Sequence, residues 1–252
     1  MLYTERKTEI LKHLELKSVV KVSDLVRDIG VSTDTIRRDL KAMEKEGLLR
    51  CIRGGACLSD KIEMFSNFAG REIINIELKR EAAKKAVKYI NENDVIFLNS
   101  GTTNTILAQE IAERAPQCTI VTNNIAVVSV IMAHPNIKVV VLGGNLDNLE
   151  KSVYGSVCEK ELSTFCFDVS FLSVNSVNTE MGYTDFRFNE IPIMQAAVKC
   201  SKKVVTVMDS SKFGRAAKKR IFGLEETDLL VTDNSDIQEE KKKLIEAGLN
   251  IV

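Results

Sequence analysis

Residues 32–47 read STDTIRRDLKAMEKEG, and this stretch decides the fold of the N-terminal part of the chain. Ser32 is a good helix N-cap, because its hydroxyl can accept a hydrogen bond from a free backbone amide in the first turn. Apolar residues recur behind it at helical spacing, at Ile36, Leu40 and Met43. Arg37 and Arg38 lie outside this apolar stripe. The stretch therefore predicts an amphipathic helix that carries an arginine pair on its polar side.

Two shorter helices are predicted before this one. Residues 4–15 place apolar side chains at helical spacing, and Ser23 is positioned to cap a second helix that ends at Gly30. Glycine can adopt a positive φ, so Gly30 allows a tight turn into the helix that follows. The order helix, helix, tight turn, helix is that of a helix-turn-helix.

A short hairpin is predicted directly after the three helices. Residues 48–58 read LLRCIRGGACL, with Gly54 and Gly55 as the expected turn and Arg50 and Arg53 beside it. A helix-turn-helix followed by such a hairpin predicts a winged helix-turn-helix, which is a DNA-binding fold.

The charge distribution agrees with DNA binding at this end. Residues 1–57 hold 12 Lys+Arg and 9 Asp+Glu, whereas the other residues hold 23 Lys+Arg and 26 Asp+Glu, in a chain of zero net charge. An arginine pair on a helix is by itself most often part of a solvated face. The prediction of DNA binding therefore depends on the neighbouring elements. A neutral chain also argues against a protein that coats nucleic acid along its whole surface.

We expect the polar side of this helix and the hairpin to contact DNA. Arginine can pair with the O6 and N7 atoms of guanine in the major groove. Arg38 lies nearly opposite the apolar stripe and is the better candidate for a base contact, whereas Arg37 is equally suited to clamp phosphate or to hold Asp34 or Asp39. The expected DNA-contacting residues are Ser32, Thr33, Thr35, Arg37, Arg38, Arg50, Arg53, Gly54 and Gly55.

Length and composition fit two domains. A chain of 252 residues, of which 44% are hydrophobic, can form one domain of about 60 residues and a larger one of about 150 to 190. We expect a winged helix-turn-helix domain in 1–58, a partly ordered linker in 59–76 and a second domain in 77–252. No apolar run is long enough to span a membrane, and the charged N-terminus does not read as a secretion signal, which favours the cytoplasm.

The six cysteines and two histidines do not suggest a metal site. No two cysteines have the two-residue gap that is typical of zinc sites. We interpret the cysteines as small core residues and expect no bound metal or cofactor.

Short apolar runs alternate with helical stretches in the second domain. A helix is expected at 79–91, and strands are expected at 95–98, 119–122, 139–142, 169–174, 204–208 and 229–232. Continuous apolar strands interleaved with helices indicate a mostly parallel sheet that is covered on both faces. The second domain is therefore predicted to be an α/β domain.

Small polar residues follow every predicted strand. Ligands of open α/β sheets bind outside the carboxyl ends of the strands, so these residues would crowd one rim with hydroxyls, amides and backbone N–H groups. Residues 100–103, SGTT, are the best single element, because Gly101 allows close approach and the next helix would aim its N-terminal amides at an anion. Turn chemistry explains any one such loop, but six together favour a sugar phosphate, with Lys212 as a point charge.

Several motifs together resemble one family across essentially the full chain. VSDLVRDIGVSTDTIRRDLKAMEKEGLLRCIRGGA carries the most specific pieces, and SGTTNTILA, IVTNN, VVLGGN, GYTDFRFNE and VMDSSKFG follow in the family's order. The chain resembles the DeoR family of bacterial transcription regulators. The resemblance implies a homodimeric or homotetrameric repressor that binds operator DNA through the winged helix. It also implies a C-terminal sensor, similar to sugar-phosphate isomerases and coenzyme A transferases, in which a phosphorylated sugar binds and releases the DNA.

The resemblance further implies an effector site. It places Ser100, Gly101, Thr102, Thr103, Asn123, Gly143, Gly144, Glu190 and Lys212 on the family's sensor motifs. Asn124 and Asn175, which follow two predicted strands, join them as candidates.

Two departures from the family pattern affect this site. The family commonly has a glycine-rich loop after the fourth sensor strand, whereas residues 173–178 here read SVNSVN. It also commonly has an arginine shortly after the glycine pair, where this chain has Leu146 and Asp147; Lys151 is the candidate to replace that charge. The identity of the effector is therefore less transferable than the fold.

Two other functions are compatible with the residues. The second domain could be an active sugar-phosphate isomerase or transferase, which would need a carboxylate as general base. Residues 173–178 contain no carboxylate, which leaves Asp185 and Glu190 as candidates, and we expect no catalytic residue. Alternatively, the winged helix could bind protein instead of DNA, in which case binding would not weaken steeply with salt.

Overall fold

The computed structural model describes residues 2–17, 19–46, 48–57, 68–72, 75–114 and 117–252. It divides the chain into two compact units, Met1–Asn75 and Ile76–Val252. The linker expected at 59–76 lies largely outside the described residues, and so does Leu58 at the end of the expected hairpin. A short helix, α4 (Phe68–Glu72), falls within that stretch.

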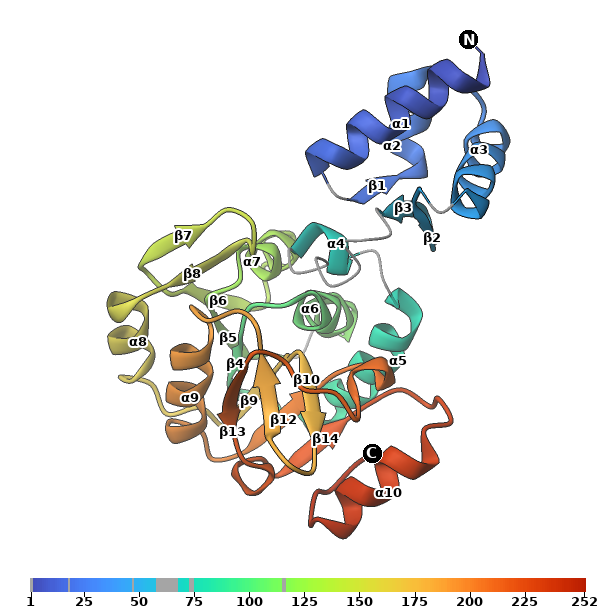
Figure 1. Ribbon diagram of the computed structural model, residues 1–252. Coiled ribbons are helices and arrows are strands. Elements are labelled where there is room, and N and C mark those ends of the chain that lie inside the picture. Colours follow the sequence, from blue (N-terminus) through green and yellow to red (C-terminus); the bar gives the residue numbers. More distant parts are fainter. Residues whose placement is uncertain (1, 18, 47, 58–67, 73–74, 115–116) are drawn as a thin grey trace. The chain divides into compact units, whose positions relative to one another are not determined.

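The first unit is a winged helix-turn-helix, as predicted (Figure 1). Its helices are α1 (Tyr3–Lys17), α2 (Val22–Ile29) and α3 (Thr33–Lys45). Its antiparallel sheet has the order β1-β3-β2 and consists of β1 (Val19–Lys21), β2 (Arg50–Ile52) and β3 (Gly55–Cys57). Side chains from all three helices close one core: Ile10, Leu14, Leu25, Ile36, Leu40 and Met43. Strand β1 was not predicted.

The helix ends follow the sequence signals with one exception. Ser32 caps α3, because its hydroxyl accepts a hydrogen bond from the Thr35 amide at 3.2 Å. Gly30 has a φ of +73° and ends α2, as expected. The expected cap at Ser23 is wrong: Lys21 is the N-cap residue of α2, without a side-chain hydrogen bond, and Ser23 lies inside the first turn. Pairing of β1 with β3 already fixes the backbone that enters α2.

The tip of the hairpin lies one residue earlier than predicted. Arg53 and Gly54 form the turn between β2 and β3, and Gly54 has a φ of +81°. Gly55 belongs to β3, where it pairs with Ile52 of β2 and with Lys21 of β1. A Cβ atom on Gly55 would collide with the carbonyl group of Val20, so only glycine fits where β3 approaches β1.

Six parallel strands form the main sheet of the second unit. They are β4 (Val95–Leu98), β5 (Thr119–Thr122), β6 (Lys138–Val141), β9 (Val169–Leu172), β12 (Val204–Val207) and β14 (Leu229–Val231). All six predicted strands are present, within three residues of their expected ends. The order in the sheet is β14-β12-β9-β4-β5-β6. The chain therefore starts in the middle at β4, runs out to β6, and returns to the other side of β4 at β9.

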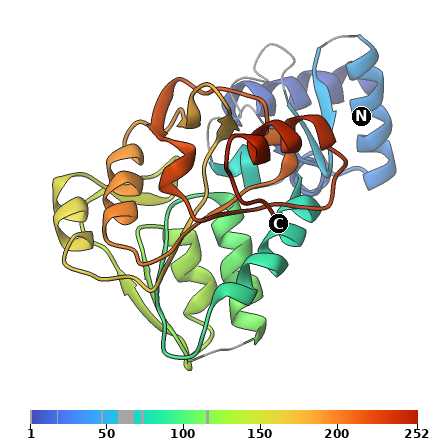
Figure 2. The ribbon, with the colours of Figure 1, turned by 90° about the horizontal axis from the view of Figure 1, so that it is seen from below.

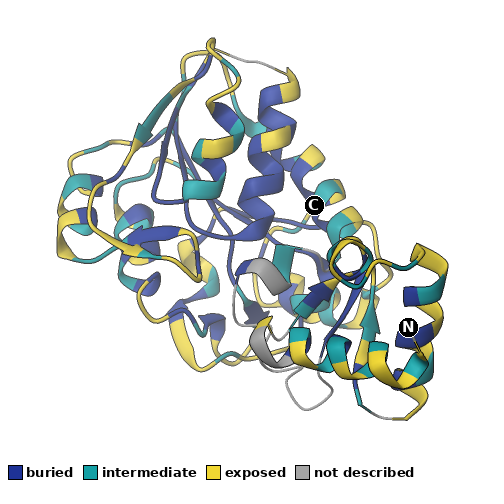
Figure 3. Ribbon diagram, turned by 90° about the horizontal axis from the view of Figure 1, so that it is seen from above, coloured by how far each residue is buried: buried dark blue, intermediate teal, exposed yellow. Residues whose placement is uncertain are grey.

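Helices cover both faces of this sheet, as predicted (Figure 2). One face packs against α5 (Ile76–Ala86), α6 (Thr102–Arg114) and α7 (Ile125–Ile131), and the other against α8 (Ser156–Leu162) and α9 (Ile191–Lys199). Alternate strand residues serve the two faces: Ile96 and Leu98 point to the first cluster and Phe97 to the second. Helix α6 is buried along most of its length (Figure 3).

The remaining elements are short. The expected helix at 79–91 is instead α5 followed by the 3-10 turn η2 (Val87–Tyr89). Helix α10 (Gln238–Glu246) packs Leu244 into the second cluster, and two further 3-10 turns are η3 (Ser210–Lys212) and η4 (Leu224–Glu226). Two antiparallel additions were not predicted: β7 (Asn145–Asp147) with β8 (Ser152–Tyr154), and the sheet of β10 (Ser176–Asn178), β11 (Gly182–Asp185) and β13 (Lys219–Phe222).

The cysteines only partly match their prediction as core residues. All six are free thiols, and Cys57, Cys118 and Cys158 are buried. Cys51 and Cys200 are partly buried, whereas Cys166 is exposed, so it does not belong to the core. Within the described residues, no helix is both long and apolar enough to cross a membrane.

Candidate nucleic-acid interface and ligand site

Helix α3 and the hairpin border one groove in the first unit. Its volume is about 420 Å³, and its walls include Arg37 and Arg38 from α3 and Gly54 from the hairpin turn. Both arginines are exposed, and neither forms a hydrogen bond or ion pair with the described part of the chain. The groove therefore presents two cationic side chains that no described residue neutralises.

Asp39, the acidic neighbour of these arginines, is buried and forms an ion pair with a different arginine. Its carboxylate accepts two hydrogen bonds from Arg6 of α1, at 2.6 Å from Nε and 3.0 Å from Nη2. This hydrogen bond with Asp39 raises the pKa of Arg6. The structure thus contradicts the expectation that Arg37 holds Asp39, and α1 fixes α3 without drawing on the exposed arginine pair.

The other predicted contact residues divide into exposed and buried positions. Ser32, Thr33, Arg50, Arg53 and Gly54 are exposed, and the partly buried Thr35 shares a hydrogen bond with the Ser32 hydroxyl at 2.8 Å. Gly55 is buried within the sheet, so its place is structural and it offers no side chain to a ligand.

One basic residue of the groove was missed. Lys41 lies one turn after Arg37 on α3, is exposed and lines the same groove; its spacing of four residues from Arg37 was a usable signal. Cys51, also in the wall, adds no charge there, because burial raises the pKa of its thiol to about 11.

The loops after β4 and β9 meet in the middle of the second unit. Strand β4 has β5 on one side and β9 on the other, so the strand order reverses there, which is where open α/β sheets form ligand crevices. Asn99 joins the loops: its Oδ1 accepts from the Ser173 amide at 2.7 Å, and its Nδ2 donates to the Ser173 carbonyl at 3.1 Å. Gly101, with a φ of +146°, passes so close that an added Cβ would lie 2.6 Å from the Ser173 hydroxyl.

A buried arginine, absent from the predicted site, ties these loops together. Arg187 donates to the carbonyl of Ser100 at 2.7 Å and to that of Ser173 at 2.9 Å. Its guanidinium also contacts both carboxylate oxygens of Asp185, at 2.9 Å and 2.6 Å. Asp185 is fully buried, so this pair stabilises the two loops from within. The motif GYTDFRFNE contains both residues, but nothing in its spacing indicates that the arginine is buried.

Glu190 and Asn123 form a second buried cluster beside the first. Glu190 accepts from the Asn123 amide at 2.9 Å and from the Ser152 hydroxyl at 2.7 Å, and Asn123 in turn accepts from the Ser100 amide at 3.0 Å. Burial raises the pKa of Glu190, against the opposing effect of Arg187. Asn124 is equally buried and caps α7 by accepting from the Ala126 amide at 2.9 Å. These predicted residues hold the loops in place.

The start of α6 keeps polar atoms without a partner. The hydroxyls of Ser100 and Thr103 and the Oδ1 atom of Asn104 are buried and form no hydrogen bond within the described residues. Thr102 is also buried, at the first position of the helix. The first amides of an α-helix have no acceptor within the helix, so donors and unpaired hydroxyls converge at this end. Such an arrangement is suited to an anion.

The remaining predicted effector residues lie in more open positions. The Gly143 amide donates to Glu161 at 2.7 Å, and Gly144 has a φ of +143°. Lys151 is exposed at the turn before β8, and its carbonyl accepts from the Ile125 amide at 2.9 Å. Lys212 donates to the carbonyl of Val174 at 3.1 Å, which places it beside the partly buried Asn175.

Comparison with known families matches both units. Residues 6–61 match the family model described as the DeoR-like helix-turn-helix domain, and residues 74–234 match the DeoR C terminal sensor domain. The chain belongs to the DeoR family. Its similarity to members extends over the whole length. The HTH-type transcriptional regulator GolR of Listeria innocua is 32% identical over 247 residues, which cover 98% of this chain and 97% of that protein.

A second DeoR-family relative has a more informative name. The lactose phosphotransferase system repressor of Staphylococcus epidermidis is 32% identical over 252 residues and covers 98% of both chains. Among solved structures, ribose 5 phosphate isomerase A from Neisseria gonorrhoeae is similar over 54% of this chain and 53% of its own, with a TM-score of 0.41 and 22% identity.

Proposed function

We propose that this protein is a repressor of sugar-metabolism genes, which binds its operator through α3 and the hairpin and releases it when a phosphorylated sugar binds the second unit. Its DeoR-family relatives include a repressor named for a lactose phosphotransferase system, which supports a sugar-linked role. A regulator that reads the bacterial chromosome works in the cytoplasm.

The DNA-binding part of the proposal rests on one observation. Arg37 and Arg38 are exposed, and no described residue pairs with them, in a groove that also contains Gly54 of the hairpin. Selection of bound fragments from genomic DNA tests this part. The expected result is enrichment of one operator sequence, bound with an affinity that falls steeply as salt rises. If nothing is enriched above background, or if the interaction is insensitive to salt, the winged helix binds something other than DNA.

The effector part rests on the unpartnered hydroxyls at the start of α6. Ser100 and Thr103 supply two buried hydroxyls beside the first amides of that helix, which together suit a phosphate group. Lys212, Lys151 and the Gly143 and Gly144 backbone would contact the rest of the sugar phosphate. A panel of phosphorylated sugars screened for thermal stabilisation tests this, because a ligand that binds only the folded state raises the apparent stability.

Binding without catalysis fits the buried carboxylates. Proton transfer next to a sugar carbonyl needs a carboxylate within reach of the substrate. Asp185 is fully buried against Arg187, and Glu190 is occupied by Asn123 and Ser152. The expected result with a stabilising sugar phosphate is therefore binding without turnover. Steady conversion of pentose or hexosamine phosphates would favour the isomerase or transferase alternative.

Control of DNA binding would act through a homodimer or homotetramer. Two recognition helices that read neighbouring half-sites must lie about 34 Å apart, or a multiple of that distance. Effector binding at the start of α6 would change this spacing and lower the affinity for the operator. Analytical ultracentrifugation with operator DNA, with and without the effector, measures the oligomeric state and the affinity for the operator. A saturating effector that leaves operator affinity unchanged would disprove the coupling.

A further inference from the structure

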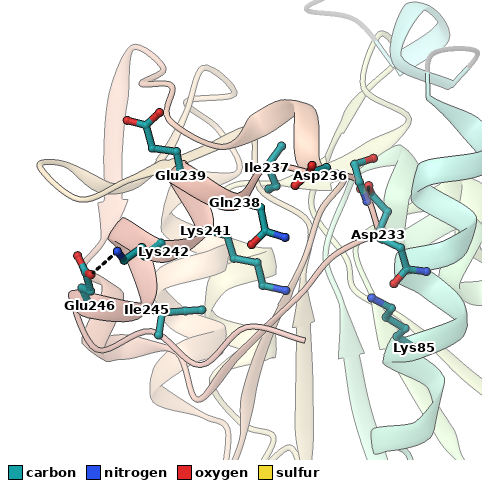
Figure 4. Close-up of a pocket in the computed structure, with 12 residues that line it drawn as sticks. Lys85, Asp233, Asp236, Ile237, Gln238, Glu239, Lys241, Lys242, Ile245 and Glu246 are labelled. Carbon is teal, nitrogen blue, oxygen red and sulfur yellow. Dashed lines mark hydrogen bonds and ion pairs between the residues drawn. The ribbon is translucent and has the colours of Figure 1, made fainter.

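The pockets of the two units differ in their charge. In the second unit, four carboxylates and three lysines line the pocket between α5 and α10 (Figure 4): Asp233, Asp236, Glu239, Glu246, Lys85, Lys241 and Lys242. These charges nearly balance one another. In the first unit, Arg37, Arg38 and Lys41 of α3 line the groove beside the hairpin, opposed by Asp34. The groove is therefore cationic, and the contacts between its two walls bear on how it meets DNA.

Strand β2 belongs to one wall of this groove and lies at the edge of its sheet. The order β1-β3-β2 leaves one side of β2 without a neighbouring strand, so backbone amides on that side need another acceptor. The amide of Cys51 donates to Oε1 of Glu44 at 2.6 Å. Glu44 lies on α3, which forms the opposite wall. A side chain of the helix therefore links the two walls.

Glu44 continues the cationic side of α3. Residues 37, 41 and 44 follow the spacing i, i+4, i+7, which places Arg37, Lys41 and Glu44 along one side of the helix. Burial is the larger cause of the raised pKa of the Cys51 thiol, and the charge of Glu44 adds to it, as expected for a carboxylate held against this residue. Glu44 thus joins β2 to the side of α3 that carries the cations of the groove.

The tip of the hairpin is held by different contacts. The Val22 amide, at the start of α2, donates to the Gly54 carbonyl at 2.7 Å, and Gly55 packs closely against the carbonyl of Val20. These contacts fix the tip against α2 and β1. The contact between Glu44 and Cys51 adds a constraint against α3, and it acts next to the exposed Arg50 of β2.

We propose that Glu44 is a positioning residue for DNA binding, whose carboxylate holds β2 so that Arg50 and the arginines of α3 reach the duplex together. This inference rests on the proposed DNA-binding function. A hairpin that is ordered before binding loses less entropy on association. The charge of Glu44 alone would act in the opposite direction, because a negative charge beside the groove repels phosphate. The sign of the change in affinity therefore distinguishes positioning from charge.

The test uses full-length variants and a double-stranded oligonucleotide that carries the fragment enriched by the genomic selection. Glu44→Ala removes both the charge and the acceptor, and it is expected to raise the Kd about three- to tenfold through the loss of one hydrogen bond. Glu44→Gln removes the charge but keeps a carbonyl oxygen for the Cys51 amide. Its Kd, measured by fluorescence anisotropy, should equal that of wild type or fall below it.

Glu46→Ala is the matched control. Glu46 is the C-cap residue of α3, but its carboxylate contacts Tyr3 and Lys7 of α1 instead of the hairpin. The variant removes one acid from the same end of the helix, so its Kd should not rise. A rise equal to that of Glu44→Ala would assign the effect to the helix end and not to the hairpin.

Arg50→Ala supplies a readout that a general loss of stability would not change. Added to Glu44→Gln, it should cost as much affinity as it costs in wild type. Added to Glu44→Ala, it should have little further effect, because β2 is no longer held where Arg50 reaches the DNA. Such coupling between the two residues is expected only if Glu44 acts through the hairpin.

Hydrogen exchange at the Cys51 amide, followed by NMR without DNA, measures the contact itself. A hydrogen-bonded amide exchanges more slowly than one that is open to water, so exchange should be faster in Glu44→Ala than in wild type and in Glu44→Gln. Equal exchange rates in the three proteins would show that Glu44 does not hold β2, and the proposal would be wrong.

The binding measurements separate failure of this proposal from failure of the proposed function. If wild type binds the operator but Glu44→Ala binds it as tightly as Glu44→Gln does, Glu44 has no positioning role. The same follows if Arg50→Ala costs equal affinity in both backgrounds. A wild-type protein that selects no operator would instead refute DNA binding, and the positioning role with it.

Discussion

Arg187 donates a hydrogen bond to the backbone carbonyl of Ser100, at 2.7 Å, across 87 positions of the chain. The same guanidinium holds the carbonyl of Ser173, so one side chain sets the separation of the two loops at the centre of the sheet. Because Asp185 is fully buried, the positive charge is balanced without solvent. The separation of these two loops is therefore fixed by contacts within the protein.

Replacing Arg187 by alanine is expected to destabilise the second unit strongly. The change removes the guanidinium partner of the buried Asp185 carboxylate, and losing one partner of a buried ion pair costs about 3 to 5 kcal/mol in comparable cases. Urea unfolding followed by circular dichroism measures the loss. Arg215→Ala, at an exposed position, is the control and should shift the free energy of unfolding by no more than about 0.5 kcal/mol. A loss below about 1 kcal/mol for Arg187→Ala would contradict a structural role for this pair.

Thr103→Val separates ligand binding from stability. The buried Thr103 hydroxyl has no hydrogen-bond partner among the described residues, so its replacement by a methyl group should leave the unliganded protein equally stable or up to about 1 kcal/mol more stable. If that hydroxyl receives the effector, the thermal shift produced by an active sugar phosphate should fall sharply in the same variant. Unchanged effector binding would remove Thr103 from the site.

Gly101→Ala is expected to disturb the contact between the loops after β4 and β9. The new Cβ would meet the Ser173 hydroxyl at 2.6 Å, at a φ of +146° that L-residues rarely adopt. Such strain costs about 1 to 3 kcal/mol. The double variant Gly101→Ala/Ser173→Gly should recover the part of the stability that is due to the collision and leave the backbone part. No recovery in thermal denaturation would mean that backbone strain accounts for the whole effect.

The buried carboxyl of Glu190 should make stability depend on pH. Burial raises its pKa above the ordinary value of 4.5, so the folded protein holds this proton more tightly than the unfolded chain does. The resulting stabilisation is fully present below the unfolded pKa and is lost as pH rises through the raised value. Glu190→Gln lacks this dependence.

The measurement is the difference in unfolding free energy between wild type and Glu190→Gln, taken from about pH 4 to about pH 8. This difference should shift in favour of the variant as pH rises. Glu180→Gln, an exposed position, is the control. A constant difference across the range would show that Glu190 has the same proton affinity in the folded and unfolded states.

Arg38→Ala tests how the groove reads DNA. If Arg38 contacts a base, the variant should lose about 1 to 3 kcal/mol of operator affinity and tolerate substitutions at one operator position. If it contacts phosphate, binding should weaken equally for all sequences and the salt dependence should become shallower. Arg37→Ala, measured in the same electrophoretic or fluorescence assay, assigns the second arginine by the same criteria. Lys45→Ala, on the last turn of α3, is the control.

The main sheet was predictable because most of its strands are buried on both faces. Strand β4 is a continuous apolar run, β5 has an apolar centre between two threonines, and the predicted limits of both agree with the structure to the residue. The two antiparallel additions were missed because strands such as β7 are only three residues long and partly exposed. A short strand of mixed polarity has no pattern that distinguishes it from a loop.

The candidate site was predicted in its loops but not in its internal contacts. Polar residues after strands indicated where Ser100 and Asn123 would meet, because parallel strands end at one rim. Their burial could not be read from the sequence, since small polar residues are equally common in open turns. Arg187 was missed for a related reason: an arginine is buried only when a partner such as Asp185 is held against it, and that pairing depends on the tertiary fold.

The two strands of the β7–β8 hairpin differ in how firmly they are held. Its returning strand is anchored where Ser152 and Val153 meet Glu190 and Asn123, whereas residues 145–149 and Lys151 lie outside that buried cluster. Residues 145–149 therefore form a mostly exposed surface beside the buried cluster of Glu190 and Asn123. A substitution at residues 145–149 would therefore leave the buried hydrogen bonds of Ser152 and Val153 in place.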